Sequence, residues 1–152
     1  MFDMPNTKRI GEISEAVVPA EFLKEGFPVL LPFGDNQRYD MVVNVSGRFL
    51  RVQCKTASPC GWKGDGSCIR FKARSGGFGP GDRMTNRSQP YRGEVDLFAV
   101  YAPSNGQVYV LAVDEVPETD VWMRLTPARN NQQLKVRLAE EHTLVAWAAR
   151  QS

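Results

Sequence analysis

The sequence is poor in residues that bind metals through nitrogen or sulfur. Its 152 residues include one histidine, His142, and three cysteines, Cys54, Cys60 and Cys68. These four residues match no usual spacing of zinc ligands, so a cysteine-zinc protein is only a weak alternative. An odd number of cysteines without close pairing predicts free thiols in a reducing compartment. We therefore expect a cytoplasmic protein, in a bacterial cell or in the interior of an organelle.

Long apolar segments are also absent. No run approaches the roughly 20 residues of a transmembrane helix, and the N-terminal stretch "MFDMPNTKRIGE" lacks the apolar core of a signal peptide. Apolar residues make up 42% of the chain and charged residues 24%, which is normal for a soluble globular protein. The sequence contains no internal repeat. Residues 1–152 are therefore expected to form a single domain that is large enough to bury a core.

The net charge of +2 is unevenly distributed along the chain. Residues 61–93, "GWKGDGSCIRFKARSGGFGPGDRMTNRSQPYRG", include seven basic and two acidic residues, a net charge of +5. Residues 1–60 are balanced, and residues 94–152 carry a net charge of −3. A glycine-rich basic segment of this kind can follow a phosphate backbone. The alternative is a solvated, flexible pair of loops.

The pattern of apolar residues predicts one helix followed by several strands. "EISEAVVPAEFLKEG" has helical spacing with Gly26 as its stop, and "FPVLLPF" is typical of a short buried strand. "EVDLFAVYAP" and "GQVYVLAVDEV" predict two strands around the turn "SNG", "VWMRL" a further short strand, and the C-terminal tail a helix or a loop followed by one. This order favours an α/β domain with a mixed sheet. The apolar stripe expected on the helix consists of Ile13, Ala16, Val17, Ala20 and Leu23, with Phe22 adjacent.

Residues 39–45 and 49–57 predict a β-hairpin whose register can be argued from its side chains. Burying both apolar sets on one face requires odd-numbered positions of the first strand to oppose even-numbered positions of the second. In that register Asp40 shares the other face with Gln53 and Lys55. A carboxylate, an amide oxygen and a cation then meet at one end of the hairpin. The alternative for Asp40 and Lys55 is a plain cross-strand ion pair.

These three residue types suit a site for a divalent cation. Mg²⁺ takes oxygen ligands, usually one or two carboxylates with water and phosphate. Asp40 and the side-chain oxygen of Gln53 can supply two, and the backbone carbonyl of Cys54 lies between them. Lys55 can stabilise phosphate charge or lower the pKa of an attacking water. A second carboxylate is available from Glu12 or Glu15 of the predicted helix.

The motifs "GEISE", "RYD" and "VQCK", in that order, resemble the PD-(D/E)XK nuclease superfamily. More narrowly, "RYDMVVNVSGRFLRVQCKTA" is similar to its small intron-encoded homing endonucleases, a branch known for a glutamine at the acidic position of the (D/E)XK motif. The resemblance is good over roughly the first 57 residues, with weaker echoes in "EVDLFAVY" and "VYVLAV". It implies a restriction-endonuclease-like core, a mixed central sheet flanked by helices, and Mg²⁺-dependent cleavage of double-stranded DNA.

Carried over residue by residue, the resemblance makes Glu15 the helix carboxylate, preceded by Gly11 in a G-x-x-x-E arrangement. Asp40 becomes the motif aspartate, and Gln53 and Lys55 become the (D/E)-x-K pair. Glu15, Asp40, Gln53 and the carbonyl of Cys54 are the implied metal ligands. Gln53 departs from the superfamily pattern, because it removes one negative charge. That departure leaves a catalytically inactive DNA-binding module as an alternative, beside a nuclease for branched DNA such as a Holliday junction resolvase.

With DNA as the expected substrate, residues 61–93 are interpreted as a DNA-contact insertion. In "IRFKARS", Arg70, Lys72 and Arg74 alternate with apolar residues, so a strand would place all three on one face. Arg38 either holds a phosphate or caps its loop. A double-strand break needs two active sites, so we expect a homodimer or homotetramer. The basic residues expected to contact DNA are Arg38, Lys63, Arg70, Lys72, Arg74, Arg83 and Arg87, whereas Trp62, Trp122 and Trp147 are expected as core anchors.

Overall fold

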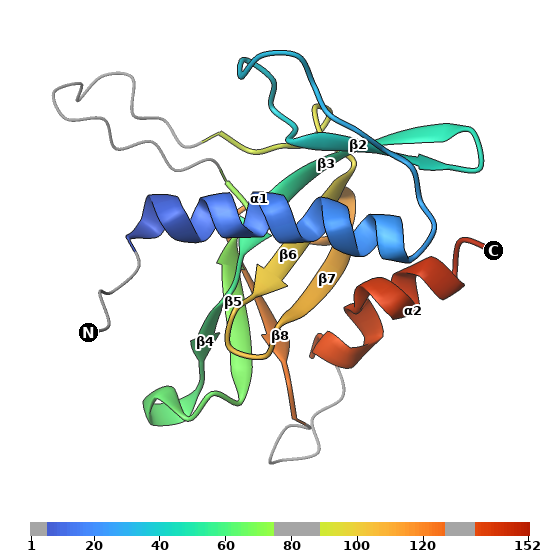
Figure 1. Ribbon diagram of the computed structural model, residues 1–152. Helices are drawn as coiled ribbons and strands as arrows, with labels where there is room; N and C mark the ends of the chain where they lie inside the picture. Colours follow the sequence, from blue (N-terminus) through green and yellow to red (C-terminus); the bar gives the residue numbers. More distant parts are fainter. Residues whose placement is uncertain (1–5, 75–88, 127–135) are drawn as a thin grey trace, which may run out of the picture.

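The computed structural model describes residues 6–74, 89–126 and 136–152. Within these ranges, no helix combines the length and the apolar character that a membrane crossing requires. Figure 1 shows the arrangement of the elements. The elements are α1 (Thr7–Lys24), β1 (Val29–Leu30), β2 (Met41–Val45), β3 (Arg48–Thr56), β4 (Ser58–Cys60), β5 (Cys68–Lys72), β6 (Leu97–Ala102), β7 (Gln107–Ala112), β8 (Asp120–Arg124) and α2 (Leu144–Ala149), with short 3₁₀ turns at Trp62–Gly64, Val113–Glu115 and Ala139–His142.

The central sheet has the strand order β1-β2-β3-β6-β7. Its strands β3 and β6 run parallel, and its other neighbours pair antiparallel. Strand β6, "LFAVYA", is buried on both faces, which explains its nearly continuous apolar run. The predicted mixed sheet with flanking helices is confirmed. Helices α1 and α2 pack on one face, where Phe22, Ala99 and Trp147 belong to one apolar cluster.

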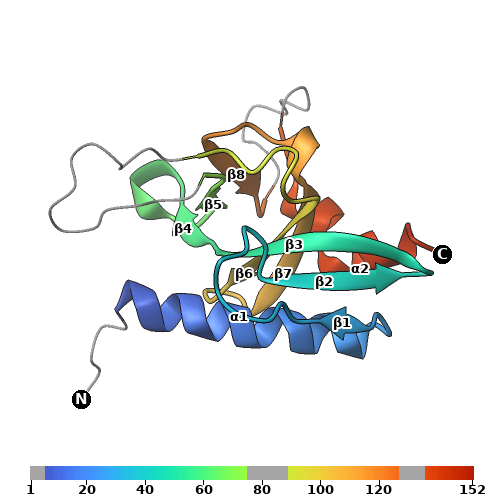
Figure 2. The same ribbon diagram turned by 90° about the horizontal axis from the view of Figure 1, so that it is seen from above.

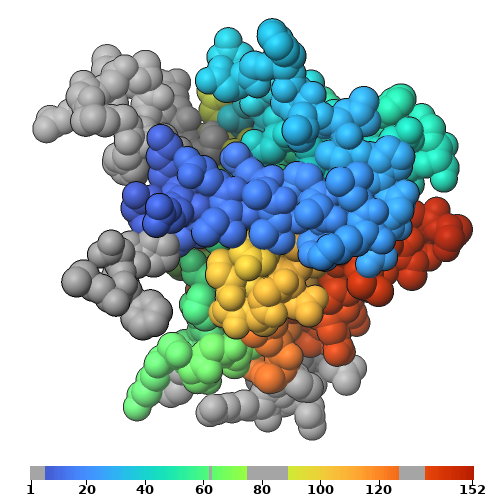
Figure 3. All heavy atoms as spheres, in the orientation of Figure 1, coloured from blue at the N-terminus to red at the C-terminus, as the bar shows by residue number. Residues whose placement is uncertain are grey.

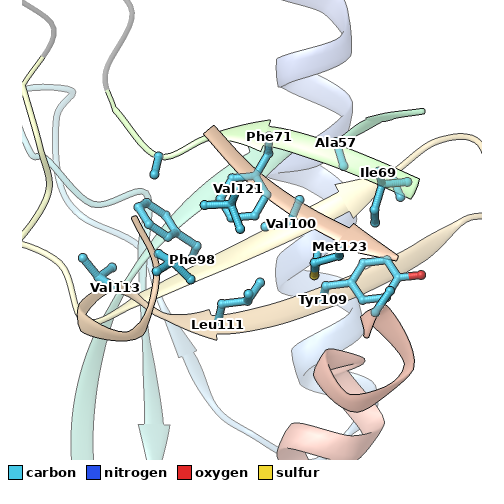
Figure 4. Close-up of a cluster of buried hydrophobic side chains, with 14 of the residues drawn as sticks. Ala57, Ile69, Phe71, Phe98, Val100, Tyr109, Leu111, Val113, Val121 and Met123 are labelled. Carbon is cyan, nitrogen blue, oxygen red and sulfur yellow. The ribbon is translucent and has the colours of Figure 1, made fainter. Parts of the chain in front are cut away.

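A second sheet, of order β4-β5-β8, covers the opposite face of β6 and β7. Figure 2 shows it on the far side of the central sheet from α1. Side chains of β5 and β8 such as Phe71 and Val121 meet those of β6 and β7 such as Phe98 and Leu111, as Figure 4 shows. The sequence did not assign this sheet. Because β5 carries buried Ile69 and Phe71, residues 61–93 contribute to the core and are more than a pair of surface loops.

Helix α1 begins earlier than expected and buries a different stripe. Asn6 caps it by accepting a hydrogen bond from the backbone amide of Arg9, so the helix starts at Thr7. The fully buried positions are Ser14, Val18 and Phe22, which follow one another every four residues. The predicted stripe is wrong, since Ile13 and Leu23, two of its members, are exposed. A hydrogen bond allows the polar Ser14 to occupy a buried position that an apolar pattern cannot indicate.

The segment "FPVLLPF" forms only the two-residue edge strand β1, and the prediction of a buried strand is wrong. Leu31 is 71% exposed, and Phe33 is fully exposed. Pro28 and Pro32 flank the strand, and proline cannot donate to a sheet ladder. Strand β1 therefore ends after Leu30, and the chain leaves the sheet before it reaches β2.

The hairpin of β2 and β3 has the predicted register. Met41 opposes Val52, and Val43 opposes Leu50. Ser46 and Gly47 both have positive φ, 52° and 87°, which is the backbone of a tight type I′ hairpin turn. The turn and the apolar alternation agree, so the odd-numbered residues at the end of β3 share one face.

Two expectations about particular residues are wrong. Cys60 and Cys68 are directly opposed in β4 and β5 and form a disulfide, whereas Cys54 is a buried free thiol. The eight-residue separation along the chain gave no sign of a pairing that antiparallel strands create. Trp147 lies in the core as expected, but Trp122 is 50% exposed on β8. The structure does not describe the side chain of Trp62.

Candidate active site

The carboxylate of Asp40 is tied to strand β3 at the point where β2 begins. The backbone amide of Asp40 donates to the carbonyl of Val52 at 2.8 Å, and its Oδ2 accepts from the amide of Cys54, also at 2.8 Å. Burial raises the pKa of Asp40, although the Cys54 amide and the nearby charge of Lys55 act to lower it. The hydrogen bond from Cys54 therefore orients the carboxylate of Asp40, and partial burial removes some of its hydration.

Glu15, on α1, is the second carboxylate of this region. Its pKa is raised, first by burial, then by the negative charges of Asp40 and Glu12. Glu15 and Asp40 therefore lie close enough for their negative charges to repel each other. Both residues line one cavity, and a cation bound there would stabilise the two carboxylates.

A cavity of about 460 Å³ separates α1 from the start of β2. Glu15, Asp40 and Cys54 line it, and so do residues of the segment between β1 and β2. Asp35 in that segment brings a third acid to the cavity wall, one that the sequence patterns did not single out. Within the described ranges, no three His, Cys, Asp or Glu side chains are arranged to hold a metal together. Oxygen atoms of an amide, a carbonyl or water must therefore complete any cation site.

Gln53 and the carbonyl of Cys54 offer such neutral oxygens. Gln53 is half-buried on β3, and its Nε2 donates to the Cys54 carbonyl at 3.4 Å. The donor set of two carboxylates, an amide and a carbonyl fits a hard cation such as Mg²⁺. A cation bound by the Cys54 carbonyl would compete with this contact to the amide nitrogen of Gln53.

Lys55 projects from the same face of β3 as Gln53. Its hydrogen-bond partners come from residues further along the chain. Its Nζ donates to the carbonyl of Arg74 at 3.2 Å and to the hydroxyl of Tyr91 at 3.3 Å. Burial lowers the pKa of Lys55 to about 8, Asp40 opposes the shift, and Arg38 adds to it. The ammonium is therefore held by two acceptors, near Asp40, in a poorly solvated position.

The ring of Tyr91 contacts two cationic side chains, those of Lys55 and Arg38. The Nζ of Lys55 lies 4.6 Å from the centroid of its ring, and the Cζ of Arg38 lies 4.2 Å from it. Arg38 is also paired with Glu94 at 2.6 Å and donates to the carbonyl of Pro90 at 3.0 Å. The sequence patterns missed Tyr91, because no local motif marks a residue that is 36 positions from Lys55.

Ser14 connects α1 to the end of β3. Its Oγ lies 2.6 Å from the Oγ1 of Thr56, and it donates to the carbonyl of Ile10 at 3.2 Å. Ser14 precedes Glu15, and Thr56 follows Lys55. This contact fixes the helix carboxylate relative to the lysine across 42 positions of sequence.

The expected DNA-contact residues fall into separate groups. Arg70 and Lys72 are exposed on β5, where the Cζ of Arg70 lies 5.3 Å from the Trp122 ring centroid. Lys63 is exposed in the turn after β4. Arg74 is half-buried at the end of this region, and Arg38 belongs to the Tyr91 cluster. Arg83 and Arg87 lie outside the described residues.

Comparison with known proteins finds a family model, a phage protein and a solved structure that are similar to this chain. A family model described as PD-(D/E)XK endonuclease matches residues 5–145. Protein 5.3 of Escherichia phage T7 is 33% identical over 107 residues, which is 70% of this chain and 80% of the phage protein. The solved structure of a bacterial homing endonuclease, I-Ssp6803I, has a TM-score of 0.72 at 27% identity, covering 96% of this chain and 93% of that chain.

Proposed function

The chain belongs to the PD-(D/E)XK endonuclease family, and from that membership we propose that it is a Mg²⁺-dependent, site-specific endonuclease of the intron-homing type. Its substrate in this proposal is double-stranded DNA, and the reaction is hydrolysis of phosphodiester bonds. Membership confirms the resemblance drawn from the three sequence motifs. The likeness in fold to a homing endonuclease supports the narrower assignment.

The observation that carries the proposal is that Glu15 and Asp40 line one cavity and that the charge of Lys55 lies near Asp40. The two carboxylates come from α1 and from the start of β2, and each has a raised pKa. Burial disfavours the charged form of Asp40, whereas Glu15 is more exposed and is affected by partial burial and by the charge of Asp40. A bound cation would offset both effects. A structural role alone does not explain why three acids, Glu15, Asp35 and Asp40, line one partly enclosed space.

Glu15, Asp40, the side-chain oxygen of Gln53 and the carbonyl of Cys54 are the proposed ligands of Mg²⁺. When bound, the cation polarises the scissile phosphate and lowers the pKa of an attacking water. The neutral Gln53 leaves two negative charges in this ligand set. We therefore expect weaker metal binding than a site with three carboxylates has.

Lys55 stabilises the negative charge that grows on the phosphate during attack. Its ammonium is positioned by the Arg74 carbonyl and the Tyr91 hydroxyl, so little reorganisation is needed when the charge develops. Its pKa of about 8 leaves it mostly protonated at neutral pH. Lys55 thus acts as a positive charge under ordinary conditions.

For DNA binding we propose the exposed face of the second sheet. Arg70 and Lys72 extend from β5, and Trp122 on β8 adds an aromatic surface beside Arg70. Solvated cations of this kind neutralise phosphates and release counterions. Lys63, Arg74 and Arg38 extend the proposed contact set. Arg83 and Arg87 remain proposed contacts outside the described residues.

The assembly and its location are part of the proposal. One active site cuts one strand, so a double-strand break requires a homodimer or a homotetramer. A DNA substrate implies that the enzyme works in the cytoplasm or in an organelle interior. That location rests on the substrate and not on the cysteines, two of which are paired.

The direct test is cleavage of a library of intronless genomic DNA from the host, followed by sequencing of new ends. The wild-type protein is compared with Lys55→Ala, each with Mg²⁺ and with EDTA. Lys24→Ala is the matched control, because Lys24 is exposed near the far end of α1 and pairs with Glu21. We expect new ends at one or a few sites with Mg²⁺, retained in Lys24→Ala and lost in Lys55→Ala. Bound but uncut DNA in every sample would contradict the proposal.

The neutral Gln53, with its amide bonded to the Cys54 carbonyl, favours one second candidate: a catalytically inactive DNA-binding module. Tight DNA binding without cleavage, unchanged in Lys55→Ala, would select it. A four-way DNA junction added to the same assay tests the structure-specific alternative. Cleavage of that junction with no cleavage of linear duplex would replace the homing assignment.

A further inference from the structure

The segment between β1 and β2 presents apolar side chains to solvent. Phe33 has a relative exposure of 104%, the largest among the large apolar side chains of the described residues, and Leu31 is 71% exposed. Single exposed apolar residues are common on proteins. Two in one short segment, one of them a fully exposed aromatic ring, suggest contact with a partner.

This segment is also a wall of the cavity that holds Glu15 and Asp40. Leu31, Pro32 and Gly34 line that space, and Phe33 stands between two of these lining residues. In Figure 3 the light-blue atoms at the upper edge of the molecule, above α1, belong to this part of the chain. Adjacent residues are only about 3.8 Å apart at their Cα atoms. A macromolecule whose phosphate enters the cavity must therefore pass close to Phe33.

The residues on either side of Phe33 restrict the backbone. Pro32 has a restricted φ, and Gly34 has a φ of +87°, which a residue with a side chain rarely adopts. Phe33 thus follows a proline with a fixed φ and precedes a glycine whose positive φ few other residues adopt. The backbone on both sides of Phe33 is therefore restricted, while its side chain is fully exposed to solvent.

The charge of the segment indicates which part of DNA it contacts. Residues 29–37 contain no basic residue and one acid, Asp35, so the segment does not suit the phosphate backbone. The apolar parts of a duplex are the base faces and the thymine methyl groups, reached through a groove or at an opened base step. We propose that Phe33 is a wedge that packs against or between the bases next to the scissile phosphate, with Leu31 beside it. This inference rests on the proposed function.

The first test uses Phe33→Trp, with Phe49→Trp as its matched control. Phe49 is 59% exposed near the opposite end of the β2–β3 hairpin and does not line the cavity. The probe is a duplex of about 40 base pairs, long enough to cover a protein–DNA interface of ordinary size, selected from a random library by binding to the wild-type protein with Ca²⁺ in place of Mg²⁺. After subtraction of wild-type emission, DNA is expected to quench the tryptophan introduced at position 33 and to shield it from acrylamide. The emission of the tryptophan introduced at position 49 is expected to stay unchanged.

The second test measures affinity for the same duplex. Phe33→Ala is expected to bind about tenfold more weakly, the size of a lost base stack. Its dependence of affinity on salt is expected to match that of the wild type, because no phosphate contact is removed. Phe33→Leu recovers part of the loss, since an aliphatic wedge also fits between bases. Phe49→Ala is expected to bind as the wild type does.

The outcomes separate this inference from the function on which it rests. If no duplex is enriched, the DNA-binding function fails and the wedge fails with it. If the duplex binds but emission from the Phe33→Trp variant is not quenched and Phe33→Ala keeps full affinity, only the wedge is overturned. If Phe33→Ala instead dissociates the DNA-free protein into monomers in sedimentation, with DNA affinity retained, the wedge is overturned as well, and the apolar segment is a contact between copies of this chain.

Discussion

The end of the β2–β3 hairpin and the exposed face of the second sheet both carry charged residues. The charged groups are partly buried at the hairpin and exposed to solvent on the second sheet. At the hairpin, Asp40 and Lys55 are partly buried and bonded to backbone or ring groups, and both have shifted pKa values. On the second sheet, Arg70 and Lys72 are exposed. Groups that stabilise a transition state must be held in place before the reaction. Groups that displace counterions from DNA work best in solvent.

The sharpest test of this difference is Asp40→Asn. The amide oxygen can still accept from Cys54, but the negative charge is gone. We expect cleavage to fall at least about 100-fold. Thermal stability should be unchanged or higher, because burial raises the pKa of Asp40 and makes its charge costly. Single-turnover cleavage and a thermal melt check both.

Asp96→Asn is the control for that substitution. Asp96 accepts three hydrogen bonds from Arg51, and those bonds lower its pKa. We expect the variant to melt at a lower temperature and to cleave at the wild-type rate. Wild-type cleavage by Asp40→Asn would remove the distinction between the two acids.

The second prediction concerns the dependence of stability on pH. Lys55 has a pKa of about 8 when folded, against 10.5 as its ordinary value. Between these values the unfolded chain binds more protons, so the free energy of unfolding rises with pH. Lys55→Met should lose that rise and be about 1–2 kcal/mol more stable than the wild type below the folded-state pKa of Lys55. Urea titrations in EDTA, from neutral pH to above the ordinary lysine pKa, measure it.

Lys24→Met is the control, because Lys24 is exposed and should keep the wild-type rise. Burial also raises the pKa of Cys54, and because its thiol titrates first in the unfolded chain, this group lowers the free energy of unfolding at alkaline pH. The comparison therefore uses the difference between the Lys55→Met and Lys24→Met curves. A Lys55→Met curve parallel to the wild-type curve would show that Lys55 is solvated. The hairpin end would then resemble the second sheet.

The third prediction asks what holds Lys55 in place. Tyr91→Phe removes the hydroxyl that accepts from Nζ but keeps the ring beneath Lys55 and Arg38. We expect the single-turnover rate at saturating DNA to fall about three- to tenfold, with DNA affinity unchanged. Tyr91→Leu removes the ring as well and should cost more. A loss of affinity at an unchanged rate would assign Tyr91 to DNA binding instead.

The smallest expected effects are on the second sheet. Arg70→Ala and Lys72→Ala should each weaken DNA binding about threefold and reduce the salt slope by about one. The rate at saturating DNA should not change. Arg92→Ala is the matched control, since Arg92 is engaged by Glu118 and by the Val116 carbonyl. Anisotropy titrations at several salt concentrations would contradict the comparison if the Arg92 variant lost as much affinity.

Local patterns were most reliable where neighbours in sequence are also neighbours in space. The register of β2 and β3 followed from apolar alternation, because a one-residue slip would have reversed the faces. That register alone brings Asp40, Gln53 and Lys55 to one end of the hairpin. The motif resemblance then named Glu15 as the helix acid, and the structure brings Glu15 and Asp40 to one cavity.

The same patterns failed where burial depends on distant partners. Ser14 is buried because Thr56 meets its hydroxyl, and Leu31 is exposed because β1 ends at the sheet edge beside a proline. Trp122 lies on the outer face of a sheet that no local signal assembles. In each case hydrophobicity indicated a preference, and a long-range contact decided the outcome.

By itself, the sequence determined the mixed sheet, the hairpin register and the set of residues at its end, because local periodicity, turn chemistry and motif order all depend on neighbouring residues. Only the tertiary structure decided that Tyr91 holds Lys55 and Arg38, that Cys60 pairs with Cys68, and that Phe33 stands beside the cavity of Glu15 and Asp40. The physical reason is that these arrangements arise from strand pairing and packing between segments that no local pattern connects.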